Sequence, residues 1–301
     1  MKKIVVAGGT GDLGKRIVNA LVRLGAEVHV IVRHQKQKEK INALKSSGIS
    51  VTETDFKNID TIATACAGAH CVVSALAGLR DVIVDAQKVL LDGAIEAKVP
   101  RFIPSDYSID FTKFNEGKNR NLDLRREFHR YLDNAPIAST SIFIGAFMEL
   151  LIAEMPLILF KQKKILYWGE KNHPLQFTTK DDTANYTAHV ALDDTSRRKL
   201  HIAGDLVSPL QFKTMLSQIT GTPYSFLHPG GLSFLSFMIK VVKTVAPSKG
   251  ELYPAWQGMQ YMRNMIDKSA VLERLDNGRY PDIKWTGVRE MLSAREIKAG
   301  G

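Results

Sequence analysis

Apolar residues in the first half of the chain follow two alternating spacings. Short apolar runs of strand type cover residues 3–7, 28–32, 50–54, 70–75, 101–104 and 138–143. Between them, apolar residues recur at helical spacing, which predicts helices over 12–24, 36–47, 58–67, 80–97 and 117–134. Strands and helices that alternate in this way form βαβ units around a parallel sheet. We therefore predict an α/β fold of Rossmann type, with a doubly wound parallel sheet.

The pattern changes after Phe147, where segments become longer and less regular. We predict an NAD(P)-binding Rossmann domain over residues 1–150 and a smaller C-terminal substrate-side region over 151–301, with segments that return to the sheet. Residues 232–246 predict an apolar helix with lysines on one side. We expect this helix to pack in the core, and the alternatives are a pocket lid, an oligomer face or a membrane-surface element.

A glycine-rich segment joins the first predicted strand to the first predicted helix. Residues 8–14 read Gly-Gly-Thr-Gly-Asp-Leu-Gly. Glycines allow a tight turn and a close approach of the backbone to a pyrophosphate, and the helix N-terminus adds oriented N–H groups. Because the segment lies between a strand and a helix of a βαβ unit, we predict dinucleotide binding. The expected contacts are Gly8, Thr10, Gly11, Asp12, Leu13 and Gly14.

The end of the second strand indicates which dinucleotide binds. Enzymes that use NAD usually carry an acidic residue there, which bonds the ribose 2′-hydroxyl. This chain instead has Arg33, followed by His34, Lys36, Lys38 and Lys40. A guanidinium can bind a 2′-phosphate through paired hydrogen bonds. We therefore predict NADP(H) as the cofactor, with Arg33 and Lys40 as its phosphate ligands.

The ends of the third and fourth strands are also expected to border the cofactor, since ligands of open α/β sheets lie at the carboxyl ends of strands. Asp55 and Phe56 follow the third strand and are expected to flank the adenine. Ser74, Ala75 and Leu76 follow the fourth and are expected to run under the ribose and phosphates.

Composition and charge exclude several other classes. The 301 residues carry a net charge of +10, but the basic residues are scattered and lack a nucleic-acid-binding signature, so no nucleic-acid partner is predicted. The two cysteines, Cys66 and Cys71, exclude a disulfide framework and fit a reducing cytoplasm. No spacing of cysteine and histidine indicates a metal site. The longest apolar stretch, 141–160, is interrupted by glutamates and a proline, so we expect no transmembrane segment.

Common catalytic signatures are missing from the expected places. Many short-chain dehydrogenases use Tyr-x-x-x-Lys, in which the lysine lowers the pKa of the tyrosine. Tyr107 and Tyr131 are followed four residues later by Phe111 and Ala135. The Gly-x-Ser-x-Gly segment of many hydrolases is also absent from the sequence.

Three segments are distinctive when they are taken together. They are the glycine segment with Arg33, Arg-Phe-Ile-Pro-Ser-Asp-Tyr at 101–107, and Phe-Thr-Thr-Lys-Asp-Asp-Thr-Ala at 177–184. Together they resemble the NmrA-like and isoflavone-reductase-like branch of atypical short-chain dehydrogenases. The resemblance implies a Rossmann domain, NADP(H), and a cleft between the two regions. It also implies that Ser105 and Tyr107 border the nicotinamide, and that the segment from Ile144 to Phe147 passes near the nicotinamide or the substrate.

One position departs from the pattern of this family. Its reductases place a catalytic lysine in a pattern like Lys-x-x-[Ile/Val]-Arg-Arg, which ends here at Arg125 and Arg126 and puts Asn121 at the lysine position. Asparagine can hydrogen-bond, but it has no proton of tunable pKa. Lys118 could substitute only if the helix begins early enough. The proton donor stays open, with Lys118, Asn121 and Tyr107 as candidates.

Two functions are compatible with the resemblance. The first is an NADPH-dependent reductase of a small aromatic, quinone-like or enone substrate, since hydride transfer needs mainly positioning by the protein. The second is a non-catalytic regulator that senses NADP(H) and binds a protein partner. Asn121 favours the regulator, whereas the aromatic and methionine-rich second half, which could line an apolar pocket, favours the reductase. We expect the reductase, in the cytoplasm.

Overall fold

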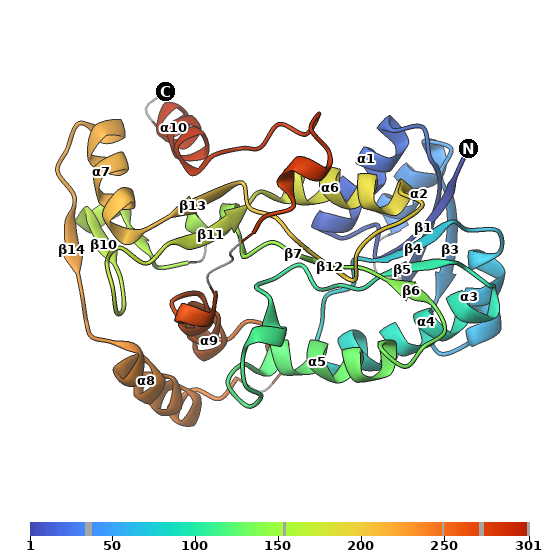
Figure 1. Ribbon diagram of the computed structural model, residues 1–301, viewed down its shortest axis with the longest axis horizontal. Coiled ribbons are helices and arrows are strands. Elements are labelled where there is room, and N and C mark those ends of the chain that lie inside the picture. Colours follow the sequence, from blue (N-terminus) through green and yellow to red (C-terminus); the bar gives the residue numbers. More distant parts are fainter. Residues whose placement is uncertain (34–37, 153–154, 249, 271–273, 300–301) are drawn as a thin grey trace.

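The computed structural model describes residues 1–33, 38–152, 155–248, 250–270 and 274–299 (Figure 1). Its largest sheet has six parallel strands in the order β3-β2-β1-β4-β5-β6. These strands are β1 (Lys3–Ala7), β2 (Glu27–Arg33), β3 (Ser50–Thr54), β4 (Cys71–Ser74), β5 (Arg101–Ile103) and β6 (Ala138–Ser139). The order 3-2-1-4-5-6 is that of the Rossmann fold, so the predicted fold class is confirmed.

Helices cover both faces of this sheet, as Figure 1 shows at its right-hand end. One face carries α1 (Asp12–Arg23), α2 (Lys38–Ser46) and α6 (Lys180–Leu192). The other carries α3 (Ile59–Cys66), α4 (Gln87–Glu96) and α5 (Arg120–Leu132). Successive residues of β1 point to opposite faces, Ile4 and Val6 into the first core and Val5 and Ala7 into the second. Burial on both faces explains why the strand is a continuous apolar run.

Three predicted elements differ from those observed, one in helix type and two in their boundaries. The predicted helix over 80–97 begins as a π-helical segment, η1 (Asp81–Ala86), which leads into α4. The helix expected from residue 117 begins at Arg120, because the Asn119 side chain accepts the Leu122 N–H and caps it there. The strand expected over 138–143 divides into β6 and β7 (Ser141–Phe143), since β7 pairs with a strand of the second half.

The second half forms small sheets beside the Rossmann half, at the left of Figure 1. The first joins β7 to β12 (Lys199–His201), and the second joins β8 (Ala146–Phe147), β11 (Leu175–Thr178) and β13 (Asp205–Val207). The third joins β9 (Ile158–Leu159), β10 (Lys164–Leu166) and β14 (Ser225–Leu227). Four helices pack around them: α7 (Pro209–Thr220), α8 (Leu232–Val245), α9 (Ala255–Met265) and α10 (Val288–Ala299).

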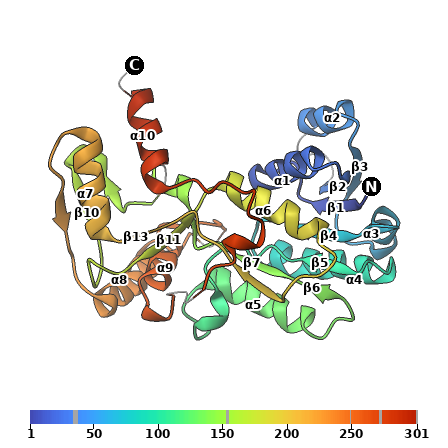
Figure 2. The same cartoon turned by 45° about the horizontal axis from the view of Figure 1, so that its top comes forward.

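The chain crosses between the two halves more than once. Helix α6 belongs to the second half of the sequence but lies along α1, as Figure 2 shows. Strand β12 likewise returns to pair with β7. These crossings bring the start of α6 close to the glycine-rich loop, where Lys180 donates a hydrogen bond to Asp12.

Helix α8 has the predicted limits, but the expectation that it packs in the core is wrong for one of its faces. Leu235 and Ile239 are buried, and α8 packs against α9. Phe234, Phe237 and Val245 are exposed to solvent instead. Of the helices in the described ranges, none is both long and apolar enough to span a bilayer.

Candidate cofactor and substrate site

The glycine-rich loop is so tight that side chains do not fit at several of its positions. Gly8 has a φ of +84°, and its carbonyl accepts the Gly11 N–H at 3.0 Å. A Cβ atom at Gly14 would lie 2.1 Å from the Gly8 oxygen, which is backbone and cannot move away cheaply. A Cβ atom at Gly8 would lie 2.7 Å from the Ala75 oxygen. The first turn of α1 is therefore pressed against the ends of β1 and β4.

The N-terminus of α1 can bind an anion. Its N-cap is Gly11, which has no side chain to occupy the first N–H groups. The Asp12 carboxylate turns away to Lys180 of α6 at 2.7 Å and Arg16 at 3.0 Å. These hydrogen bonds, with Lys180 the larger influence, hold the pKa of Asp12 below its ordinary value. Because two cations neutralise the Asp12 carboxylate, this side chain does not oppose an anion at the N-terminus of α1.

Two basic side chains from different elements lie beside this loop. Arg33 ends β2, is exposed, and has its Nη2 3.8 Å from the Asp81 carboxylate of η1. Lys40 reaches back from α2, with its Nζ 3.4 Å from the Thr10 carbonyl oxygen. Of the two predicted phosphate ligands, Lys40 therefore contacts the glycine-rich loop, whereas Arg33 lies at the end of β2 and faces η1. His34 and Lys36 lie outside the described residues.

The next two strand ends differ in what they offer to a ligand. Asp55 is exposed, whereas the ring of Phe56 is buried in the core, so Phe56 presents mainly backbone to the expected adenine. Ser74 is fully buried, and its hydroxyl has no hydrogen-bond partner among the described residues. The Ala75 N–H donates to Ala7 at 2.9 Å, which aligns residues 74–76 along the glycine-rich loop. The glycine cradle and the unpaired Ser74 hydroxyl fit a dinucleotide.

Ser105, expected at the nicotinamide end, uses all of its polar groups within the protein. Its hydroxyl donates to the Leu76 carbonyl at 2.6 Å, and its N–H donates to Gln87 Oε1 at 2.9 Å. Its carbonyl accepts from Arg125 Nε at 3.0 Å. Ser105 therefore ties the ends of β4 and β5 to α4 and α5, which fixes the floor of the cleft.

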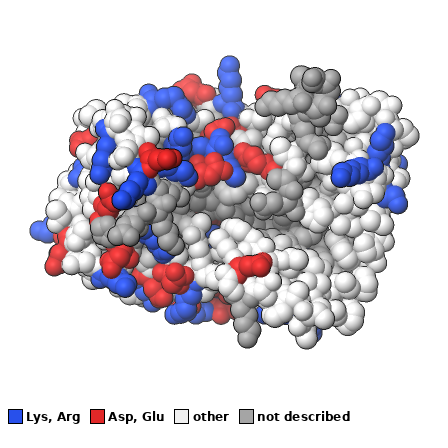
Figure 3. Space-filling view, turned by 180° about the vertical axis from the view of Figure 1, so that it is seen from behind, with Lys and Arg blue, Asp and Glu red and all other residues white. Residues whose placement is uncertain are grey.

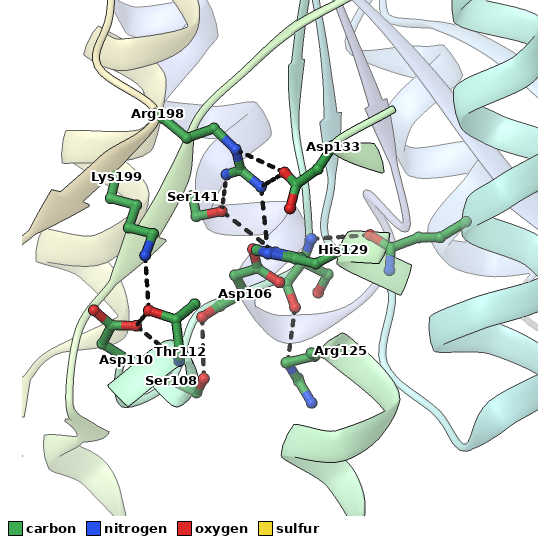
Figure 4. A network of polar contacts seen from close by, with 12 residues as sticks. Asp106, Ser108, Asp110, Thr112, Arg125, His129, Asp133, Ser141, Arg198 and Lys199 are labelled. Atoms are coloured by element: carbon green, nitrogen blue, oxygen red, sulfur yellow. Dashed lines mark hydrogen bonds and ion pairs between the residues drawn. The ribbon is translucent and has the colours of Figure 1, made fainter. Parts of the chain in front are cut away.

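Asp106 lies in a buried polar network that Figure 4 shows. Its Oδ2 lies 2.6 Å from His129 Nε2 on α5, and Arg198 bridges to this pair by donating to Ser141 Oγ at 2.6 Å. Arg198 also pairs with Asp133 at 2.7 Å. Burial acts to raise the pKa of Asp106, but His129 and Ser141 outweigh it and hold the pKa below its ordinary value. Asp106 is thus a buried carboxylate that anchors the segment after β5 to α5.

Two of the three candidate proton donors are poorly placed. Tyr107 is 7% exposed and packs in the core shared by the sheet and α6, with its hydroxyl beside Thr187. Burial raises its pKa, and its ring lacks access to a ligand. Lys118 is exposed and precedes the Asn119 cap, so it is not on α5 and fails the condition set for it.

The third candidate, Asn121, is buried where α5 meets α9. Its Oδ1 accepts from Arg120 Nε at 3.0 Å, and its Nδ2 donates to the Leu252 carbonyl at 3.1 Å. The Tyr261 phenol on α9 is close enough to Asn121 for the amide to act on the phenol's pKa, which it lowers. Tyr261 is missed by the sequence analysis, because a contact over 140 residues leaves no signal in spacing.

Tyr261 lies between two cations and the apolar residues of α9. Burial raises the pKa of its phenol most, while Arg125 and Arg120 act to lower it, and the net shift is upward. The phenol therefore keeps its proton at neutral pH. Arg120 is itself held in place, since its guanidinium lies 4.7 Å from the centre of the Trp256 ring and donates to Leu252 O at 2.8 Å.

The segment after β7 forms one wall of a small apolar pocket. Ile144 is buried, with its N–H donating to Ser108 O at 2.9 Å, so its side chain belongs to the core. Gly145 has a φ of +72°, and a Cβ there would lie 2.3 Å from Gln176 O. The pocket has a volume of about 40 Å³ and is lined by Ile109, Gly145, Pro174, Gln176, Leu206, Met265 and Ala270. Within the described ranges, no cluster of histidine, cysteine or acidic side chains could hold a metal ion.

Comparison with known proteins places this geometry in a family. The model of the NmrA-like family matches residues 1–264. Pinoresinol reductase 1 of Arabidopsis thaliana is 23% identical over 96% of both chains. The complex of AtPrR2 with NADP+ and (+)-pinoresinol has a TM-score of 0.82 at 21% identity, over 97% of this chain and 98% of that one. The NADPH complex of an Escherichia coli quinone oxidoreductase has a TM-score of 0.75 at 17% identity, over 97% and 99%.

The family match covers most of the chain, and both solved structures share its fold from end to end. The resemblance found in residues 8–14, 101–107 and 177–184 is thereby confirmed. The chain belongs to the NmrA-like family.

Proposed function

We propose that this protein is an NADPH-dependent reductase of a small aromatic or quinone-like substrate. One observation carries the cofactor assignment, namely that an exposed arginine, Arg33, ends β2, while Lys40 Nζ lies 3.4 Å from the Thr10 carbonyl oxygen of the glycine-rich loop. An acidic residue in place of Arg33 would repel a 2′-phosphate, whereas these two cations attract it. Relatives named as pinoresinol reductases and as an NADPH-dependent quinone oxidoreductase support the reaction class.

The two halves divide the work under this proposal. Residues 1–150 bind the cofactor, which supplies the hydride, and residues 151–301 provide most of the substrate side. The pocket beside Gly145 is lined mainly by apolar side chains, which disfavours a charged group there, but its volume of about 40 Å³ is too small for an aromatic ring. Ser105 and Asp106 keep the floor between the halves rigid, so that the substrate can be held in a fixed position.

We propose Tyr261 as the proton donor in place of the lysine that the family pattern would put at Asn121. The raised pKa keeps the phenol protonated at neutral pH, and the Asn121 amide acts on it from α5. Arg120 and Arg125 would stabilise the phenolate that forms when the proton leaves. The buried amide thus takes a supporting role, for which it needs no titratable proton.

We also place the protein in a reducing compartment such as the cytoplasm. Cys66 and Cys71 are both free thiols, and burial raises the pKa of each to about 12. Such thiols are unreactive and need no disulfide partner.

Titration with NADPH and NADH tests the cofactor assignment. We expect the parent protein to prefer NADPH and Arg33→Gln to weaken NADPH binding by about 10- to 100-fold, since a charge-assisted phosphate contact is lost. NADH binding is expected to stay unchanged. Lys40→Gln is expected to weaken NADPH binding as well. Lys38→Gln is its matched control, because it removes the same charge from α2 two residues away. Equal affinity of the parent for both cofactors would overturn the assignment.

A screen of NADPH oxidation at 340 nm against quinones, enones and aryl ethers tests the reaction. Turnover of at least one class supports the reductase. The buried amide at position 121 is the one observation that favours a regulator instead. Tight NADPH binding without turnover, together with a protein partner released by NADPH and not by NADP+, would establish the regulator and refute the reductase.

A further inference from the structure

Helix α8 carries an exposed apolar stripe that the proposed reaction does not use. The stripe consists of Phe234, Phe237, Val241 and Val245, which we call the outer stripe. Their exposed fractions are 44%, 57%, 39% and 77%. The spacings of three and four residues place all four on one side of the helix. Leu235 and Ile239 on another side face the core, so the outer stripe is a second apolar face that the fold leaves in water.

The rings of the outer stripe form a continuous surface with their neighbours. Phe234 and Phe237 are stacked, with ring centres 6.3 Å apart. Trp168, which follows β10, has its ring centre 6.1 Å from that of Phe234. Leu227 at the end of β14 is also exposed. A contiguous apolar surface of this kind on a protein usually marks a site of contact with a partner or a membrane.

The charge of this end of the molecule is of one sign. Segments 155–169 and 206–250, which form β9, β10, α7, β14 and α8, contain seven lysines and no aspartate or glutamate. Six of these lysines lie in the described ranges: Lys161, Lys163, Lys164, Lys213, Lys240 and Lys243. Acidic residues adjoin both ends of each segment in the sequence, namely Glu154 and Glu170 for the first and Asp205 and Glu251 for the second. Figure 3 shows the corresponding outer end at its right, where the only charged side chains in view are Lys or Arg.

We propose that the outer stripe of α8 docks this protein on the surface of an anionic lipid bilayer. An interfacial helix buries its apolar side chains at the boundary between headgroups and acyl chains, while nearby lysines attract acidic headgroups. Helix α8 has 14 residues and is about 21 Å long, so it lies in the membrane plane. The proposal does not depend on the reductase activity.

Charge argues against two other occupants of this surface. A second copy of the chain would bring two α8 helices together, each with two lysines and no acidic residue, and like charges would oppose the contact. A nucleic acid would use the lysines, but it would leave the aromatic and aliphatic outer stripe in water. A bilayer with acidic lipids satisfies both the apolar stripe and the positive charge.

Co-sedimentation of the full chain with vesicles tests the proposal. We expect binding to vesicles of phosphatidylcholine with 30% phosphatidylglycerol, at least ten-fold weaker binding to pure phosphatidylcholine, and weaker binding at high salt. Phe237→Asp and Val245→Asp are each expected to reduce binding at least ten-fold. Val22→Asp is the matched control, because Val22 is an exposed valine in the last turn of α1 in the other half. Its binding is expected to match that of the parent.

Several results would overturn the proposal. One is equal binding to neutral and anionic vesicles, or equal loss in Val22→Asp. Another is a dimer in solution that Phe237→Asp dissociates while neither protein binds vesicles, which would assign the outer stripe to a second copy. A defined acidic protein that binds the parent and not Phe237→Asp, again without vesicle binding, would assign it to a protein. Circular dichroism and melting temperature show that the variants compared are equally folded.

Discussion

The two ends of the proposed active-site cleft are built in different ways. The glycine-rich loop is local: residues 8–14 fold on themselves, and backbone atoms at 2–3 Å exclude any Cβ at Gly8 and Gly14. The end at Asn121 is made by side chains from distant segments, with Leu252 and Tyr261 more than 130 residues away. Only glycine fits at Gly8 and Gly14 in the first end. At the second end, different side chains could fill the same space.

This difference separates cofactor binding from catalysis. A side chain at Gly14 has no space, so a family that binds a dinucleotide in this way must keep the glycine. An amide at position 121 meets its hydrogen-bond needs with Arg120 and Leu252 and costs the fold little. The proton donor can therefore move to another element, such as α9, without any change in the cofactor end.

The largest effect is expected for a substitution in the glycine-rich loop. Gly14→Ala places a Cβ against Gly8 O, so the loop must open, and we expect NADPH to bind about 1000-fold more weakly, or about 4 kcal/mol. Fluorescence titration measures this loss. Gly258→Ala is the matched control, because Gly258 lies within α9 with nothing near its added Cβ. It is expected to be neutral or stabilising by up to about 1 kcal/mol. Parent-like affinity in Gly14→Ala would show that the loop is more adaptable than its geometry indicates.

Asp106 anchors the segment after β5 to α5, and its loss has the next largest expected effect. Asp106→Asn breaks a buried pair with His129, and we expect the free energy of unfolding to fall by about 3 kcal/mol. Urea denaturation measures the change, with the exposed Asp85→Asn as a control expected to be near zero. A fall of less than 1 kcal/mol would mean that this network does not hold the floor of the cleft.

The same carboxylate predicts a pH dependence of stability. Since the folded-state pKa of Asp106 lies below its unfolded value of about 3.9, its contribution is fully present above that pH. The contribution is lost as the pH falls through the folded pKa. We therefore expect the melting temperature of the parent to drop below about pH 4 more steeply than that of Asp106→Asn. Parallel curves for the two proteins would contradict the assigned pKa shift.

Tyr261→Phe tests the site around Asn121, which side chains from distant segments form. If Tyr261 donates the proton, kcat is expected to fall about 100-fold, the lower limit usual for a general acid, while the Kd for NADPH stays unchanged. Tyr253→Phe is the control, because Tyr253 is a largely exposed tyrosine near the same helix. A loss of NADPH affinity with unchanged kcat would make Tyr261 a structural residue instead of a donor.

The sequence predicts the glycine-rich loop well and the site around Asn121 poorly, because the first depends on local contacts and the second on contacts between distant segments. The sheet, its helices and the loop at Gly8 follow from local spacing, because each is decided by neighbours within about ten residues. The partner of Asn121 depends on the packing of α9 against α5, which no local pattern encodes. The burial of Tyr107 and the exposure of the outer stripe of α8 were also beyond local patterns, since both depend on which surfaces the second half covers.

The smallest effect is expected when the same group, a tyrosine hydroxyl, is removed at a different place. Tyr107→Phe removes the same hydroxyl as Tyr261→Phe, but from a core position beside Thr187. This hydroxyl is buried without a hydrogen-bond partner among the described residues, so its removal is expected to change stability by no more than about 1 kcal/mol. Neither kcat nor NADPH affinity is expected to change, because the ring already packs like an apolar residue. A 100-fold loss of kcat in Tyr107→Phe with intact Tyr261 would place the proton donor on the segment after β5, and α9 would then serve only to close the cleft.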